Sequence, residues 1–105
     1  MYIINTTFVV EPAVHGRWYE FCTQKFIPHL QSIGMQVLVF SRILHEESTG
    51  HYSYSLQINA PQISDYQQFM REPLAEYVES ARAQYGEQTL HFTTLLKKIP
   101  LSEQN

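Results

Sequence analysis

The residues best suited to metal binding or proton transfer in this chain are its five histidines. His45 and His51 flank a predicted turn that also holds Glu46 and Glu47, so this turn offers donor atoms for a surface metal ion. The alternative is a solvated turn with pairs across two strands. We favour that alternative because no third fixed ligand is evident, and we predict no metal site.

The other three histidines are separated by the predicted elements. His15 and His29 lie about four turns apart on one predicted helix, so they cannot share a metal ion within one subunit. His91 belongs to a predicted strand and is expected beside Asn5 and Thr7, on a surface of mixed polarity. We interpret it as a hydrogen-bonded interface histidine, with a role in a binding site as the alternative.

Four aromatic residues, Trp18, Tyr52, Tyr54 and Tyr77, allow two interpretations. Aromatic residues at this spacing usually fill a core, but the same rings could line a pocket for a flat aromatic ligand between helices and sheet. Arg42 needs an anionic or carbonyl partner if it is buried. It could bind a carboxylate ligand, unless a nearby glutamate or a carbonyl of a second chain meets that need.

The composition excludes several classes of function. The chain has 105 residues and a net charge of −3, from seven basic and ten acidic residues, which argues against binding a nucleic-acid backbone. The N-terminus lacks the pattern of a signal peptide, and no apolar run reaches the ~20 residues of a membrane helix. We therefore expect a soluble cytoplasmic protein with no nucleic-acid or membrane partner.

No complete catalytic motif is present, and no cofactor is predicted. The spacing supports no Ser-His-Asp ordering, glycine-rich phosphate loop or paired-carboxylate site. Cys22 is the only cysteine, so it can form no intramolecular disulfide or zinc-finger site. Its place on the buried stripe of a predicted helix suggests a small hydrophobic residue, not a nucleophile.

The first half of the chain predicts a strand, a helix and a second strand. Residues 2–11, "YIINTTFVVE", are rich in β-branched and aromatic residues, as strands are. Pro12 fits the first turn of a helix, Pro28 should kink that helix near Phe26, and Gly34 should cap its end. Residues 35–47, "MQVLVFSRILHEE", predict the second strand.

The second half predicts a strand, a helix and a last strand. Residues 51–59, "HYSYSLQIN", alternate in polarity and should form a hairpin with the second strand. Ser64 and Gln67 predict a capping box for a helix that is broken around Pro73 and closed by Gly86. Residues 88–99, "QTLHFTTLLKKI", predict the fourth strand.

This order, β-α-β-β-α-β, predicts an α+β protein of the ferredoxin-like type. The four strands should form one antiparallel sheet with the first and third strands central, and both helices should cover one face. Residues 1–100 are expected to form a single domain, and residues 101–105 a C-terminal tail.

Hydrophobicity assigns side chains to the two faces of the sheet. The face toward the helices should carry Ile4, Phe8, Val10, Val37, Val39, Ile43, Tyr52, Tyr54, Leu56, Ile58, Leu90, Phe92 and Leu96. The opposite face should carry Asn5, Thr7, Val9, Gln36, Leu38, Phe40, Arg42, Leu44, Ser53, Ser55, Gln57, Asn59, Thr89, His91, Thr93 and Leu95.

The second of these faces is too apolar to be left in water and too polar for a dry core. A two-fold homodimer resolves both problems, because two such faces together bury the apolar residues and let Asn5, Arg42 and Gln57 hydrogen-bond across the interface. The alternative is a monomer with an open, half-solvated sheet, which antiparallel sheets permit.

Several short motifs keep their order along the chain: "NTTF", Trp18, "IPHLQSIG", "SRILHEE", "YSLQ", "SDYQQFM" and "TLLKKI". In this combination the chain resembles a domain-of-unknown-function family of small bacterial proteins with the dimeric α/β-barrel, ferredoxin-like fold. The resemblance covers residues 2–99 and implies the fold and the dimer, but no activity. In similar proteins of the wider superfamily, a histidine often stands where this chain has Phe26, so neither a mechanism centred there nor haem binding is expected.

Two function classes follow. The first is a homodimeric protein with a structural or small-molecule-binding role, in which the four aromatic residues line the pocket. The second is a cofactor-independent monooxygenase or isomerase acting on an aromatic or polyketide-like substrate, with His91, Asn5 or Arg42 polarising it. A solvent-reachable pocket with at least two convergent polar groups would favour the second class.

Overall fold

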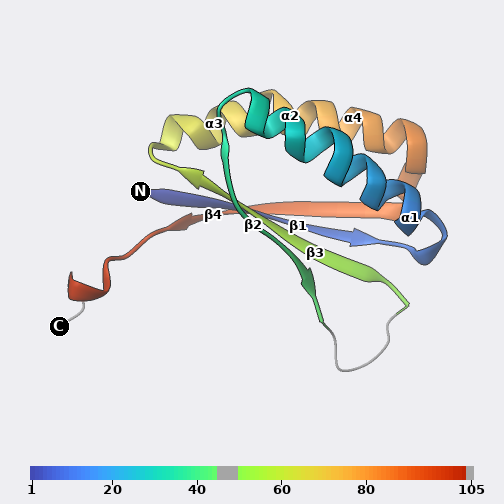
Figure 1. Ribbon diagram of the computed structural model, residues 1–105, viewed down its shortest axis with the longest axis horizontal. Coiled ribbons are helices and arrows are strands. Elements are labelled where there is room, and N and C mark those ends of the chain that lie inside the picture. The colour runs from blue at the N-terminus through green and yellow to red at the C-terminus, as the bar shows by residue number, and fades with distance from the viewer. Residues whose placement is uncertain (45–49, 104–105) are drawn as a thin grey trace.

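The computed structural model describes residues 1–44 and 50–103 and shows a sheet with a layer of helices on one side (Figure 1). A short π-helical segment, η1, joins α1 to α2, and η2 and η3 are 3-10 turns. The elements are β1 (Tyr2–Val10), α1 (Pro12–Phe21), η1 (Cys22–Phe26), α2 (Ile27–Ser32), β2 (Gln36–Ile43), β3 (Tyr52–Ala60), α3 (Ile63–Arg71), α4 (Pro73–Tyr85), η2 (Gly86–Gln88), β4 (Thr89–Lys97) and η3 (Leu101–Glu103).

The four strands form one antiparallel sheet in the order β2-β3-β1-β4. This confirms the predicted β-α-β-β-α-β succession and the central positions of the first and third strands. The α+β arrangement, with all four long helical segments over one face, is compatible with a ferredoxin-like fold (Figure 1).

Both prolines expected to interrupt the helices do so. Residues Cys22–Phe26 take a π-helical form directly before Pro28, and α4 begins at Pro73 after α3 has ended at Arg71.

The predicted capping box of Ser64 and Gln67 is wrong. The helix begins at Ile63, so Gln62 is the N-cap and its backbone N–H donates to the Asp65 carboxylate at 2.9 Å.

The core lies between the helices and the covered face of the two central strands. Ile4, Phe8, Leu56 and Ile58 are fully buried there, as predicted, and Trp18 of α1 packs on the ring of Phe8. The remaining fully or almost fully buried apolar residues come from both the sheet and the helices: Val10, Val14, Cys22, Phe26, Leu30, Tyr54, Ala60, Phe69, Leu74, Tyr77, Ala81 and Tyr85.

The predicted faces of β4 are wrong, because the strand is shifted by one residue relative to the expectation. Phe8 lies opposite His91 and Val9 lies opposite Leu90, and residues directly opposite each other share a face. Thr89, His91, Thr93 and Leu95 therefore face the helices, and the hydroxyls of Thr6 and Thr93 hydrogen-bond there at 2.9 Å. Leu90, Phe92 and Leu96 lie on the open face instead.

A bulge in β2 also reverses part of the prediction. Val37 pairs with Ile58, but Val39 pairs with Gln57, so Leu38 is one residue too many for the register. Beyond the bulge, Phe40 and Arg42 lie opposite Leu56 and Tyr54 on the helix-covered face. Val39 and Ile43, predicted to face the helices, lie on the open face.

The open face is consequently more apolar than the sequence suggested. Its large exposed side chains come mainly from the two edge strands: Leu38, Val39, Ile43, Leu90, Phe92 and Leu96. Asn5 and Gln57 lie on this face, as predicted. The Ser55 hydroxyl donates to the Asn5 side-chain oxygen at 2.7 Å, so Asn5 finds a hydrogen-bond partner within its own chain.

His45, Glu46 and Glu47, considered for a metal site at the hairpin turn, lie outside the described residues. Across residues 1–44 and 50–103, no helix has the length and apolar character to cross a membrane.

Candidate functional site

A cavity of about 300 Å³ opens between α1 and the β2–β3 edge of the sheet. His15 and Tyr19 come from α1, Phe40 and Arg42 from β2, and Tyr54 from β3. The volume is at the small end of the range for small-molecule sites. Among the described lining residues, four carry aromatic rings and Arg42 carries a formal charge.

The local structure explains why these residues meet. Pro12 starts α1 directly after β1, and His15 and Tyr19 are four residues apart, so they share one face of the helix. The bulge at Leu38 turns Phe40 and Arg42 toward the same helix. Bulges often re-aim side chains in this way next to functional sites.

His15 is held by two contacts with β3. Its Nε2 atom lies 2.7 Å from the hydroxyl oxygen of Tyr54, and its ring stacks on Tyr52 with centroids 3.7 Å apart and an interplanar angle of 10°. Burial, and secondarily the Arg42 charge, lower the pKa of His15 below its usual value. The imidazole is therefore neutral at pH 7, and its Nε2 atom can either donate or accept the hydrogen bond with the Tyr54 hydroxyl, depending on the tautomer.

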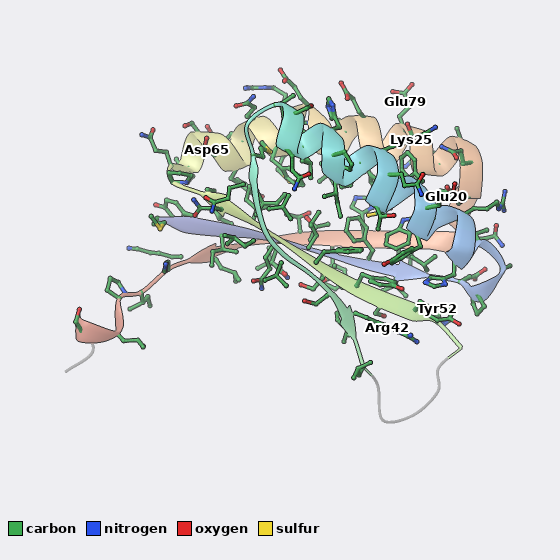
Figure 2. All side chains as sticks on the ribbon, in the orientation of Figure 1. Glu20, Lys25, Arg42, Tyr52, Asp65 and Glu79 are labelled. Atoms are coloured by element: carbon green, nitrogen blue, oxygen red, sulfur yellow. The ribbon has the colours of Figure 1, made fainter. Side chains whose placement is uncertain are left out.

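Arg42 borders the cavity as an exposed cation. Its guanidinium lies over the ring of Tyr52, 4.8 Å from the centroid, and the two side chains lie next to each other near the ends of β2 and β3 (Figure 2). Among the described residues, no carboxylate forms an ion pair with it. As a lining residue, Arg42 brings guanidinium N–H groups, which can bind an anionic group, to the cavity.

Tyr54 forms the floor of the cavity. Phe40 stacks on it at 5.3 Å and Trp18 approaches it from the core side at 5.2 Å. Burial raises the pKa of the Tyr54 phenol, and the nearby Arg42 charge only partly opposes this effect. The Tyr54 hydroxyl is therefore neutral, and it can hydrogen-bond to His15 and to a ligand at the same time.

Trp18 and Tyr77, predicted as pocket residues, belong to the core. The indole N–H of Trp18 donates to the Tyr77 hydroxyl at 2.8 Å, and the ring of Phe8 lies 5.2 Å from that of Tyr77. Burial raises the pKa of Tyr77 strongly and that of the Cys22 thiol to about 12. Neither Tyr77 nor Cys22 is ionised near neutral pH.

The predicted polar residues do not converge on one site. Arg42 lies in the cavity with Tyr54, and Tyr52 lies beneath Arg42. His91 faces the helices near the other edge of the sheet, with its ring 6.0 Å from that of Tyr77. Asn5 and Gln57 are on the open face. In the part of the chain that the structure describes, no three His, Cys, Asp or Glu side chains gather as metal ligands.

Sequence reasoning missed His15, Tyr19 and Phe40 as cavity residues. The four-residue spacing of His15 and Tyr19 in the first turns of a helix was available as a signal, but their partners come from β2 and β3. The bulge in β2 brings Phe40 to the cavity. Residues 36–43 contain no glycine or proline that would signal a bulge, so the sequence did not reveal it.

The arrangement suits a planar anion. Aromatic walls favour a flat ligand, Arg42 favours a carboxylate or another delocalised anion, and the His15–Tyr54 pair offers a neutral donor or acceptor.

Comparisons with known proteins identify a family but no activity. A family model described as Domain of unknown function (DUF4286) matches residues 1–99. Neither the curated proteins nor the solved structures contain a significant match.

Proposed function

The chain belongs to the DUF4286 family of domains of unknown function, and we propose that it acts as a homodimeric small-molecule-binding protein whose ligand is a planar organic anion. Residues 1–100 would form one domain in each protomer, with the cavity at the β2–β3 edge as its binding site.

One observation carries the binding proposal: a guanidinium with no carboxylate partner among residues 1–44 and 50–103 stands at the mouth of an aromatic cavity that also holds a hydrogen-bonded His–Tyr pair. The Tyr52 ring fixes Arg42 from below, and Tyr54 fixes His15 at 2.7 Å, so these polar groups are held in position without a ligand. Such preorganisation lowers the entropic cost of binding. The ligand's ring would lie against Phe40 and Tyr54, with its anionic group toward Arg42.

Exposed apolar side chains on the open face of the sheet support the homodimer. Phe92 is 58% exposed and Leu90 is 62% exposed, and Val39, Leu38, Leu96 and Ile43 extend the same surface. A patch of this kind on a β-sheet usually marks an interface. A second copy related by a two-fold axis would cover it with an identical patch, and Gln57 could pair across the axis.

Titration with salicylate tests the binding proposal, since this probe combines a flat ring, a carboxylate and a phenol. We expect chemical-shift changes at His15, Tyr19 and Arg42, and a weaker response to phenol, which lacks the carboxylate. Arg42→Gln should weaken salicylate binding by about 10- to 100-fold, the usual value of a hydrogen bond to a charged group.

Arg71→Gln is the matched control, because Arg71 is also exposed but lies in the last turn of α3, outside the cavity lining. Equal salicylate affinity in the Arg42 variant and the wild type would contradict the proposed site.

The alternative function is a cofactor-independent monooxygenase or isomerase acting on an aromatic or polyketide-like substrate. The neutral imidazole of His15 next to the Tyr54 hydroxyl favours it, because such a pair can move a proton to or from an enolisable carbon acid. His15→Gln separates the two functions: an enzyme would lose turnover, whereas a binding protein would keep most of its affinity for salicylate.

A further inference from the structure

A second cavity lies at the opposite edge of the sheet from the His15 site. It has a volume of about 440 Å³ and opens between the C-terminal half of α4, the turn at η2 and the start of β4. Its walls combine the apolar side chains of Val78 and Ala81 with four polar residues, Arg82, Glu87, Thr89 and His91, and Leu90 borders the opening at the strand edge.

The two charged residues of this cleft have opposite signs and do not neutralise each other. Arg82 and Glu87 are both exposed, and within residues 1–44 and 50–103 neither forms an ion pair within 4.0 Å. A simple carboxylate would be attracted by Arg82 and repelled by Glu87, and a simple amine would meet the reverse. A ligand carrying both charges would satisfy both residues.

The end of α4 strengthens the preference for a cation near Glu87. The carbonyls at the C-terminus of a helix carry partial negative charge, and α4 ends at Tyr85, two residues before Glu87. Gly86 follows with φ of 60°, and no other atom lies within 4 Å of the position a Cβ would take, so a small charged group can approach closely there.

His91 supplies a neutral donor on the Arg82 side. Burial, and secondarily the charge of Arg82, lower its pKa, so an imidazole N–H is available to a carboxylate without adding a second positive charge. The Tyr77 ring, 6.0 Å away in an edge-on orientation, supports it from the core.

We propose that this cleft binds a free α-amino acid with an apolar side chain. Arg82 and His91 receive its carboxylate, Glu87 and the end of α4 receive its ammonium group, and Val78 and Ala81 contact its side chain. This site is separate from the cavity of the proposed function, because the two share no lining residue.

Titration with L-leucine and two analogues that each lack one charge tests the proposal. 4-Methylpentanoate lacks the ammonium group and 3-methylbutylamine lacks the carboxylate. We expect backbone amide shifts confined to residues 78–91, with leucine at least 10-fold tighter than either analogue. Absence of saturable shifts, or equal affinity for the three probes, would overturn the proposal.

Two charge-neutralising variants assign the roles within the cleft. Arg82→Gln should weaken leucine binding by at least 10-fold and leave the amine unaffected, whereas Glu87→Gln should weaken leucine and leave or improve binding of the acid. Glu79→Gln is the control on the same helix, because Glu79 is exposed, does not line the cleft and points away from the sheet (Figure 2). Wild-type affinity for leucine in both cleft variants would contradict the assignment.

Arg42→Gln distinguishes this proposal from the function proposed above. Leucine binding should survive that substitution unchanged, and salicylate binding should survive Arg82→Gln.

Discussion

The covered and open faces of the sheet are built from the same four strands but place their side chains in different surroundings. On β1, Phe8 is completely buried under the helices, and it contacts the rings of Trp18 and Tyr77. On β4, Phe92 is 58% exposed on the other face although it is equally hydrophobic. The difference indicates that the covered face supplies the stability of one chain, whereas the open face is suited to contact between chains.

The largest effect should come from removing a ring from the covered face. Phe8→Ala would leave a cavity among Trp18, Phe26 and Tyr77, and burial of this kind is worth about 3–5 kcal/mol for a phenylalanine. Urea unfolding at one fixed protein concentration would measure the loss. Glu79→Ala, on the side of α4 that points away from the sheet (Figure 2), is the control and should change the free energy of unfolding by less than about 0.5 kcal/mol.

A loss for Phe8→Ala no larger than that of the Glu79 control would contradict the comparison. Such a result would mean that the helices do not bury Phe8 on the covered face in solution.

The next effect concerns association and not the folding of the chain itself. Phe92→Glu places a charge within the proposed subunit interface, where its desolvation would cost several kcal/mol, so the dimer should dissociate. Sedimentation velocity across a 100-fold concentration range would show a monomer for the variant and a dimer for the wild type.

Ile63→Glu is the matched control for this prediction. Ile63 is 51% exposed, close to the value for Phe92, but it lies at the start of α3 in the helix layer. The control should remain dimeric. A wild-type monomer, or a dimer that survives Phe92→Glu, would reject the open face as the interface.

The contrast between the faces also explains how much of the fold the sequence could predict. Polar and apolar residues alternate in β3, and in β1 the large apolar residues Ile4, Phe8 and Val10 share one parity, so both strands were placed on the correct faces. In β4 the apolar residues Leu90, Phe92 and Leu96 share one parity, so hydrophobicity assigned them to the helix side, but the observed pairing places them on the open face. Assigning the more apolar side of a strand to the buried face gives the wrong answer when the exposed face also carries large apolar residues.

The candidate site was predictable only in part for the same reason. Tyr54 and Arg42 were singled out, but Arg42 was assigned to the open face because a regular strand was assumed. The single extra residue at Leu38 reverses everything after it, and the pairing that creates this bulge is a tertiary property. His15 was considered only as a metal ligand, since its partners Tyr52 and Tyr54 are distant in the sequence.

The smallest predicted effect is the titration of the two histidines on the helix-covered side. His15 and His91 should both titrate below the usual histidine pKa of 6.5, because burial is the first cause of the shift in each case. Proton NMR of the imidazole rings between pH 5 and 8 would give the midpoints, with His15→Gln and His91→Gln to assign the signals. A midpoint for His91 at or above 6.5 would argue against its partial burial on the helix-covered side.

The same shift has a defined consequence for stability. Between the lowered pKa of the folded chain and 6.5, the unfolded chain binds more protons than the folded one, so the free energy of unfolding falls as the pH falls through this window. Above pH 6.5 both forms are neutral at these positions and their contribution is complete. His15→Gln should therefore flatten the pH dependence below 6.5, and the double variant with His91→Gln should flatten it further. If His91→Gln alone left the dependence of the free energy of unfolding on pH unchanged, the helices would not be shielding the β4 edge of the sheet from water. The difference between the covered and open faces would then apply only near the β2 edge.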